Sequence, residues 1–222
     1  MFNAAIQKAR EEVMWGVRQM VEKGYALGTA GNISARVQGH ELFVITPSSM
    51  SYSILQPEDL CVVDMEGEVL DARHKPSVET TMHRYLFLLR PEVNGIVHSH
   101  SKYATLVASI DGLETLPILD VESVSYLGGE TPIAAFYPAG SLELAEAIRD
   151  TVGTSAAILM ANHGAIGLGT SVEKAMIVND NIERTCEQYL WLRAIGGQIK
   201  AMPADYVSRV KELSLKSRGI IQ

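Results

Sequence analysis

The sequence predicts a layered α/β or α+β domain built around a central sheet. Apolar residues recur at helical spacing over 3–24, and a capping-box pattern at 170–173 opens a second long helix. Short apolar runs between these helices, notably 94–100 and 156–161, are typical of buried strands. Helices and strands therefore alternate along the chain, although irregularly, as they do in layered sheet folds.

The remaining segments fit the same architecture. Turn residues separate them, and Ser77 and Ser141 are suited to cap the helices that follow them. The stretch at 116–136 is mixed and is assigned to no single element. The other expected elements are a loop at 28–34, strands at 42–45, 61–64, 67–70 and 165–168, and helices at 77–89, 102–110, 141–152 and 203–217.

The composition predicts one soluble domain over residues 1–222. Hydrophobic residues make up 47% of the chain, which suffices for a sizeable core, and no apolar run approaches the roughly 20 residues of a membrane span. The net charge is −7 without a basic cluster, which argues against nucleic-acid or membrane partners. Cys61 and Cys186 are interpreted as reduced core thiols. The N-terminus has no apolar signal core, so a cytoplasmic location is expected.

Three histidines are the strongest candidates for a metal site. His98 and His100 are two residues apart on an expected strand, so both imidazoles point to one face. His163 follows a core strand directly and precedes a glycine turn. Three histidines with one open position form a ligand set of catalytic zinc. By contrast, His40, His74 and His83 are interpreted as surface or packing residues.

Glu79 is a candidate acid/base. It is expected in the first turn of the helix that follows Lys75-Pro76-Ser77, where the helix dipole favours a carboxylate. A nearby metal ion would favour the ionised form further. The alternative is a glutamate that only stabilises its helix.

Three turn segments together predict an anion pocket. Small residues around Gly31 allow backbone N–H groups to approach an anion, and Asn32 adds a side-chain donor. Ser48 and Ser49 supply hydroxyls, and Ser77 stands at a helix N-terminus, where phosphates bind readily. Each segment alone could be an ordinary turn, whereas the three together with the histidines favour a phosphate pocket.

The motifs GTAGNIS, ITPSS, KPSVE, VHSHS and NHGAIGLG occur in this order. Together they resemble the class II sugar-phosphate aldolase family, which includes L-fuculose-1-phosphate aldolase, L-ribulose-5-phosphate 4-epimerase, methylthioribulose-1-phosphate dehydratase and the adducin head. The resemblance covers about residues 5–195. It implies an α/β/α three-layer fold with a mostly antiparallel sheet, usually assembled as a homotetramer.

The resemblance also implies roles for individual residues. The zinc ligands would be His98, His100 and His163, with manganese or cobalt as less selective substitutes. Glu79 would be the catalytic acid/base. The phosphate pocket would be formed by Gly31, Asn32, Ser48, Ser49 and Ser77.

Four positions depart from the fuculose enzyme, namely Ser49, Val78, Glu122 and Arg218. Glu122 stands where that enzyme has a tyrosine that protonates the departing oxygen. It lies 22 residues after His100, the spacing at which the dehydratase branch carries a catalytic glutamate. Glu122 is therefore a second candidate catalytic residue, the alternative being an exposed structural carboxylate.

The resulting prediction is a zinc-dependent aldolase. It would cleave a ketose 1-phosphate, similar to L-fuculose 1-phosphate, through an enediolate to dihydroxyacetone phosphate and an aldehyde. One alternative is a dehydratase or 4-epimerase acting on a ketose phosphate such as methylthioribulose 1-phosphate. A further alternative is a non-catalytic, adducin-like assembly module, against which the three histidines and Glu79 argue.

Overall fold

A computed structural model of the chain describes residues 2–221. Its centre is a sheet in the order β4-β3-β2-β1-β5-β9-β8-β7-β6. Neighbouring strands are antiparallel except for the parallel pair β7 and β8. The strands are β1 (Asn32–Arg36), β2 (Leu42–Ile45), β3 (Cys61–Asp64), β4 (Val69–Asp71), β5 (Gly95–Ser99), β6 (Thr115–Leu116), β7 (Thr131–Ala134), β8 (Ala157–Met160) and β9 (Gly164–Gly169).

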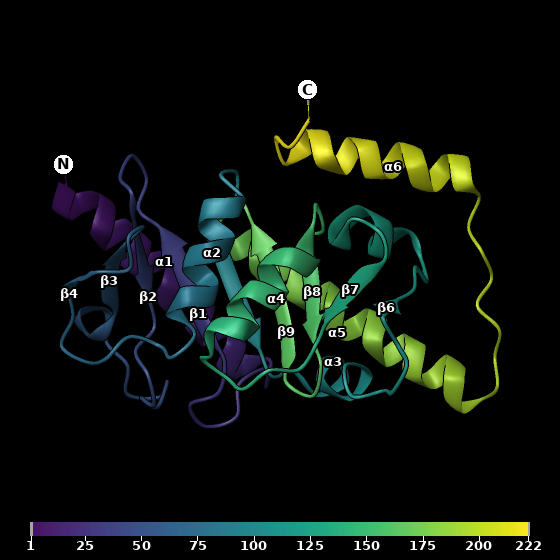
Figure 1. Cartoon of the computed structure of the whole chain (residues 1–222), viewed down its shortest axis with the longest axis horizontal. Helices are drawn as coiled ribbons and strands as arrows, with labels where there is room; N and C mark the ends of the chain where they lie inside the picture. The colour runs from purple at the N-terminus through teal and green to yellow at the C-terminus, as the bar shows by residue number, and fades with distance from the viewer. Residues whose placement is uncertain (1, 222) are drawn as a thin grey trace.

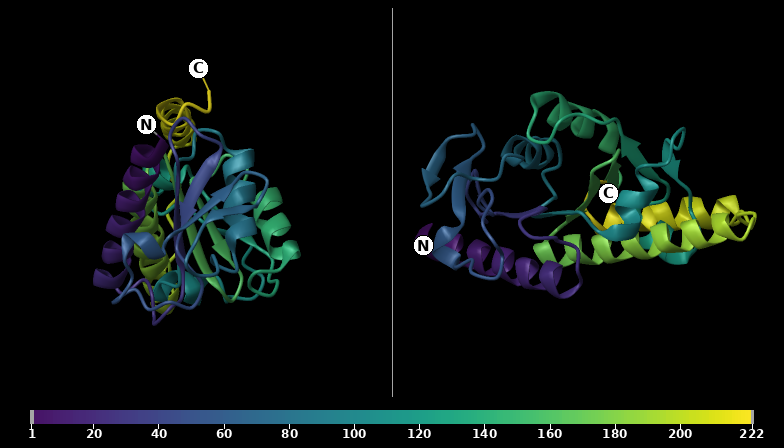
Figure 2. Two further views of the ribbon diagram at one scale, coloured as in Figure 1. Left: turned by 90° about the vertical axis from the view of Figure 1, so that its left-hand side faces the viewer. Right: turned by 90° about the horizontal axis from the view of Figure 1, so that it is seen from below.

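Helices cover both faces of the sheet, which gives three layers (Figures 1 and 2). On one face lie α1 and α5, and on the other lie α2 and α4. The α/β/α fold with a mostly antiparallel sheet is therefore confirmed. The helical segments are α1 (Phe2–Glu22), η1 (Pro57–Asp59), α2 (Thr80–Leu89), α3 (Lys102–Val107), η2 (Ser123–Leu127, π-helical), α4 (Leu142–Val152), α5 (Val172–Ala194) and α6 (Ala204–Ser217).

The alternation of side chains along the strands divides the core between the two faces. Phe43 and Phe87 pack with ring centroids 5.4 Å apart between the sheet and α2. On the other face, Ile33 and Val97 pack with Val17 of α1. Because both faces are buried, the register of the central strands is fixed, and with it the position of every polar residue on them.

The structure corrects four local predictions. Asn32 and Ser34 belong to β1 rather than to a loop, since pairing with β5 overrides their loop preference. The helix expected from Ser77 begins at Thr80. Ser171, rather than Thr170, caps α5, and its side chain accepts a hydrogen bond from the Lys174 N–H. The strand expected at 67–70 lies at 69–71.

The C-terminal helix α6 lies apart from the three layers. A segment without regular structure leads from the end of α5 along one side of the molecule to α6, and α6 itself runs back across it (Figure 1). There the Ser214 hydroxyl donates to the Ser125 carbonyl of η2 at 3.3 Å. Cys61 and Cys186 are buried and free, as predicted. No helix within 2–221 has the length and apolar character that crossing a membrane requires.

Candidate metal centre

Two adjacent strands bring the three histidines together. His98 pairs with Ile166 in the β5–β9 ladder, and the turn between β8 and β9 carries His163. This turn packs tightly against β5, because a Cβ at Gly164 would lie 2.3 Å from the Ser99 carbonyl oxygen. Glycine is therefore required after His163, and the close packing holds that imidazole beside the end of β5.

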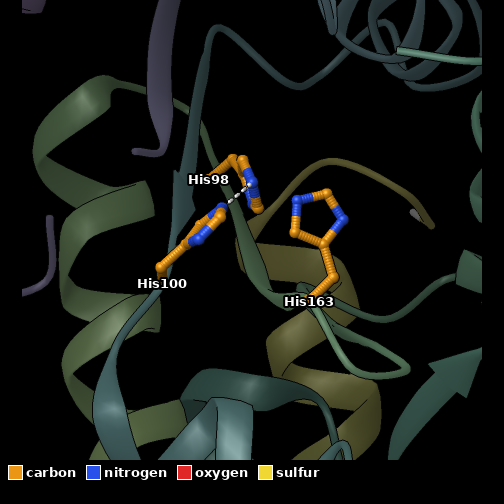
Figure 3. Close-up of side chains that lie close together, drawn as sticks. All are labelled: His98, His100 and His163. Carbon is orange, nitrogen blue, oxygen red and sulfur yellow. Dashed lines mark hydrogen bonds between the residues drawn. The ribbon is translucent and has the colours of Figure 1, made fainter. Parts of the chain in front are cut away.

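The three imidazoles form a nearly equilateral triangle (Figure 3). The ring centroids are 4.8 Å apart for His98 and His100, and 4.9 Å apart for each of these with His163. The Nε2 atoms of His98 and His100 lie 3.0 Å from each other. Two nitrogens on a tetrahedral zinc ion lie about 3.3 Å apart for bonds of about 2.0–2.1 Å. The predicted convergence of the three histidines is thus present.

Hydrogen bonding and burial leave these rings in the form that a metal needs. His98 Nδ1 lies 3.0 Å from the Ala165 carbonyl oxygen and donates to it, because a carbonyl has no hydrogen; Nε2 then offers its lone pair. Burial, followed by the nearby His98, lowers the pKa of His100 to about 3 and that of His163 to about 4. Both are therefore neutral at neutral pH, as ligands must be.

Glu79 completes the cluster and is 4% exposed. Its Oε2 lies 3.3 Å from His98 Nε2, and its Oε1 lies 3.4 Å from His163 Nε2. Burial opposes ionisation, but the interaction with His98 and the hydrogen bond from Asn32 outweigh it and lower the pKa of Glu79. Oε1 is buried without a hydrogen-bond partner. Three imidazoles and one carboxylate with an orphaned oxygen fit a divalent cation.

The position of Glu79 differs from the prediction. It is the N-cap residue of α2 rather than a first-turn residue. Its N–H donates to the Ser77 hydroxyl at 3.2 Å, and the Thr80 N–H donates to the Ser77 carbonyl. The turn at Ser77 thus delays the helix and directs Glu79 toward the histidines.

The predicted pocket segments lie side by side next to the metal cluster. Asn32 pairs directly with His98 in the β1–β5 ladder. The Thr46 carbonyl accepts a hydrogen bond from the Ser77 N–H at 3.1 Å, and the Ser48 N–H donates to the Lys75 carbonyl at 2.9 Å. The loop before β1, the turn after β2 and the segment before α2 are therefore joined.

Backbone conformation supports this arrangement at two positions. Gly31 has a φ of 77°, and a Cβ there would lie 2.7 Å from the His98 carbonyl oxygen. Ser49 has a φ of 58°, which is uncommon for a residue other than glycine and often marks a functional turn. Its hydroxyl lies 3.4 Å from that of Ser48. Close approach to β5 therefore explains the glycine, and the strained turn places two hydroxyls together.

His83, interpreted from the sequence as a surface or packing residue, is buried next to Glu79 and the β1 residues. It is fully buried and lies between Ser34 and Asn32, with hydrogen-bond distances of 2.6 and 2.5 Å to them. A sequence signal existed, since a residue four positions after Glu79 lies on the same face of α2. The other two histidines lie elsewhere: His74 Nε2, for example, is 3.1 Å from Asp59 Oδ1 at the surface.

Glu122 lies in a different environment. Its side chain is 42% exposed at the start of η2, and its Oε2 is 3.3 Å from Arg184 Nη2. Arg184 also contacts Asp120 at 2.5 Å. Within 2–221, the ion pairs and hydrogen bonds of Glu122 do not reach the three histidines.

Comparison of the whole sequence with known proteins identifies the family. The family described as "Class II Aldolase and Adducin N-terminal domain" matches residues 11–190. The chain belongs to this class II aldolase and adducin family.

Several members of the family share most of this chain. It is 34% identical to a 5-deoxy-D-ribulose 1-phosphate aldolase of Bacillus thuringiensis, over 96% of this chain and 97% of that protein. It is 31% identical to a 3-oxo-tetronate 4-phosphate decarboxylase of Haemophilus influenzae, over 95% and 98%. A solved L-fuculose 1-phosphate aldolase superimposes with a TM-score of 0.86 at 25% identity, over 92% and 95% of the two chains. Aldolases and decarboxylases are lyases, and the chain is accordingly a lyase of the class II aldolase family.

Proposed function

We propose that this protein is a metal-dependent aldolase that splits a ketose 1-phosphate into dihydroxyacetone phosphate and an aldehyde. The observation that carries the proposal is the contact of the buried Glu79 with two of three converging histidines. Among substrates, 5-deoxyribulose 1-phosphate is favoured over L-fuculose 1-phosphate, because the 5-deoxy-D-ribulose 1-phosphate aldolase is 34% identical over nearly the whole chain. Cleavage of that sugar between C3 and C4 would release acetaldehyde.

The phosphate would bind where the three pocket segments meet. Gly31 and Asn32 would form one side of this pocket. Ser48, Ser49 and Ser77 would form the other, on two segments that backbone hydrogen bonds join to each other. Exposed hydroxyls and backbone N–H groups can replace the water around a phosphate. Asn32 pairs with His98, so a phosphate held there would place the sugar carbons against the histidines.

Glu79 would move the proton on the three-carbon fragment. In the direction of synthesis, the ionised carboxylate takes a proton from the hydroxymethyl carbon of dihydroxyacetone phosphate. The electron pair left on that carbon forms the bond to the aldehyde carbon, and a second group protonates the aldehyde oxygen. Cleavage is the reverse sequence, in which Glu79 returns the proton to C3.

His98, His100 and His163 would hold one divalent cation, with zinc favoured by three nitrogen ligands and an open fourth position, and manganese or cobalt as substitutes. When bound, this ion supplies Lewis-acid stabilisation of the negative charge that develops during the reaction. Neutral His100 and His163 contribute no charge of their own, so ionised Glu79 supplies an attraction for the cation.

Two residues are candidates for the proton on the C4 oxygen. Glu122 is one, from its position in the sequence, and Tyr206 on α6 is the other.

We further propose that the enzyme works in the cytoplasm as a homotetramer, the usual assembly that the family resemblance implies. Sedimentation of the purified protein would measure the assembly directly.

A decarboxylase is the second candidate function. It is favoured by the 31% identity to the 3-oxo-tetronate 4-phosphate decarboxylase over 95% of this chain. Loss of carbon dioxide from a 3-oxo acid also leaves an electron pair on the carbon next to a carbonyl, so the same site could stabilise it. A dehydratase or 4-epimerase would use this chemistry too, without a net break of the carbon chain.

Product analysis separates these possibilities. The zinc-loaded protein is incubated with 5-deoxyribulose 1-phosphate, L-fuculose 1-phosphate, methylthioribulose 1-phosphate and 3-oxo-tetronate 4-phosphate, and the products are identified by mass. An aldehyde with dihydroxyacetone phosphate is expected from a ketose 1-phosphate. The aldolase proposal would be overturned if only 3-oxo-tetronate 4-phosphate reacted, giving carbon dioxide and dihydroxyacetone phosphate without an aldehyde. Loss of water from an intact chain would overturn it too.

A further inference from the structure

A buried polar chain lies behind Glu79. Ser34 Oγ is 2.6 Å from His83 Nδ1, and His83 Nε2 is 2.5 Å from Asn32 Oδ1. Asn32 Nδ2 then donates to Glu79 Oε2 at 2.7 Å. Ser34 and His83 are fully buried and Asn32 is 5% exposed, so water does not compete for these bonds.

The chemistry of the four groups fixes the direction of every bond. An amide oxygen has no hydrogen, so His83 Nε2 must donate to Asn32 Oδ1. Burial lowers the pKa of His83 to about 3, and the ring is therefore neutral, with Nδ1 as an acceptor. Ser34 then donates to Nδ1. Since the Asn32 oxygen faces His83, its nitrogen must face Glu79.

The two oxygens of Glu79 consequently differ. Oε2 accepts a hydrogen bond from Asn32 and also lies 3.3 Å from His98 Nε2, so a proton on this oxygen would weaken the bond from the amide. Oε1 has no hydrogen-bond partner and lies 3.4 Å from His163 Nε2. Only Oε1 is free to gain and lose a hydrogen without breaking the chain.

We propose that His83 and Ser34 are positioning residues, which lock the Asn32 amide so that Glu79 transfers its proton through Oε1 alone. This inference rests on the proposed function, in which Glu79 exchanges a proton with the carbon of the substrate. Neither His83 nor Ser34 touches the substrate; they act through Asn32.

The reverse orientation makes a different prediction. With a proton on His83 Nδ1, that ring would donate to Ser34 and accept from the Asn32 nitrogen. The Asn32 oxygen would then face Glu79 Oε2, and the two oxygens would repel each other unless Oε2 carried a proton. The tautomer of one histidine therefore reports which oxygen of Glu79 is free.

The first test is nitrogen NMR of the zinc-loaded protein with labelled histidine. The His83 signal is assigned by its absence in His83→Gln. We expect a proton on Nε2 and none on Nδ1. A proton on Nδ1, or on both nitrogens, would overturn the inference. This measurement needs no substrate, so it remains decisive even if the protein cleaves none of the ketose phosphates and the proposed function fails.

The second test is kinetic. Ser34→Ala is expected to lower kcat about tenfold with unchanged zinc content, within the roughly 10–100-fold cost of removing an outer partner in a metal site. His83→Gln, whose amide can both donate and accept, is expected to keep about tenfold more turnover than His83→Leu. If His83→Leu does not fold, Ser34→Ala still decides.

Ser99→Ala is the matched control. Ser99 is also fully buried on a central strand, and its hydroxyl makes one bond, of 2.7 Å, to Asn179 in α5 on the opposite face of the sheet. We expect its kcat to stay within about twofold of the wild-type value. An equal loss of kcat in Ser34→Ala and Ser99→Ala would mean that the buried polar chain has only a structural role. A rise in KM without a fall in kcat in Ser34→Ala would mean that this polar chain serves phosphate binding. Either result would contradict the proposal.

Discussion

Glu79 and Glu122 are two glutamates at the start of helical segments, and the structure gives them opposite surroundings. Glu79 is 4% exposed and lies among imidazoles and one amide. Glu122 is 42% exposed and lies near Arg184, a cation that Asp120 also contacts. The charge of Glu79 is incompletely balanced until a cation binds. The charge of Glu122 already has a cationic neighbour, Arg184, and contact with water.

The difference shows that burial, rather than residue type or helix position, decides what a carboxylate can do. In a dry site, an unbalanced charge favours metal binding and proton exchange, because the low dielectric strengthens both. At the surface, an ion pair contributes little and is easily replaced by water. The predictions below test this contrast, beginning with the largest expected effect.

Removing one metal ligand should abolish function. In His98→Ala, we expect the zinc content and the turnover to fall together, with a loss of affinity beyond the roughly 10–100-fold that outer partners cost. Metal analysis after dialysis and a cleavage assay measure the two losses. A variant that keeps one zinc ion per chain would remove His98 from the ligand set.

Removing only the carboxylate charge should separate metal binding from turnover. In Glu79→Gln, the three imidazoles remain, so zinc should stay bound while kcat falls by about 10²–10⁴-fold, the usual contribution of a general acid/base. The measurement is kcat at saturating substrate, alongside metal content. Retained turnover would exclude Glu79 from proton transfer.

The buried side of the comparison should also be visible in the pH dependence of stability. His83 has a pKa of about 3 when folded and about 6.5 when unfolded, so the unfolded chain binds more protons between these values. Stability is therefore full above about pH 6.5 and falls as the pH drops toward 3.

Between about pH 7 and pH 5, the free energy of unfolding of the metal-free protein should fall. His83 should account for at most about 2 kcal/mol of this fall. Urea unfolding at both pH values gives the fall in the free energy of unfolding for wild type and for His83→Gln. The difference between the two falls is the contribution of His83. His100 and His163 titrate in both proteins and cancel. Identical pH profiles would mean that His83 is protonated, or exposed, in the folded state.

The exposed side of the comparison should give the smallest effect. In Glu122→Gln, we expect kcat to fall no more than about tenfold and the free energy of unfolding to change by less than about 1 kcal/mol, as is usual for exposed ion pairs. A loss as large as that of Glu79→Gln would instead make Glu122 an essential proton donor or acceptor.

Much of the fold followed from local patterns. The bounds of α1, β2 and β3 agree with their apolar periodicity within two residues, and Ser141 caps α4 through the Leu144 N–H as predicted. These signals are local, because a helix or strand buries a face that its own residues define. The expected loop at Asn32 was wrong for the opposite reason, since its strand exists only through pairing with β5.

Some features of the candidate site also followed from local sequence, whereas others depended on the tertiary structure. His98 and His100 were predicted two residues apart on a strand, which puts their side chains on one face. The sequence alone was therefore enough to predict that these two imidazoles lie together. The approach of His163, the burial of Glu79 and the junction of the pocket segments depended on strands and turns that are distant in the chain. Only the tertiary structure decided these, because contacts across the sheet follow from register and packing rather than from spacing.

His83 is the clearest case of that division. Its helix and its place four residues after Glu79 were readable, but its partners Ser34 and Asn32 come from β1, about 50 residues earlier. The sequence determined which chemical groups this protein carries and which local faces they occupy. The packed sheet and helices decided which of those groups lose water and meet, since only the folded core brings distant polar groups together in a dry environment.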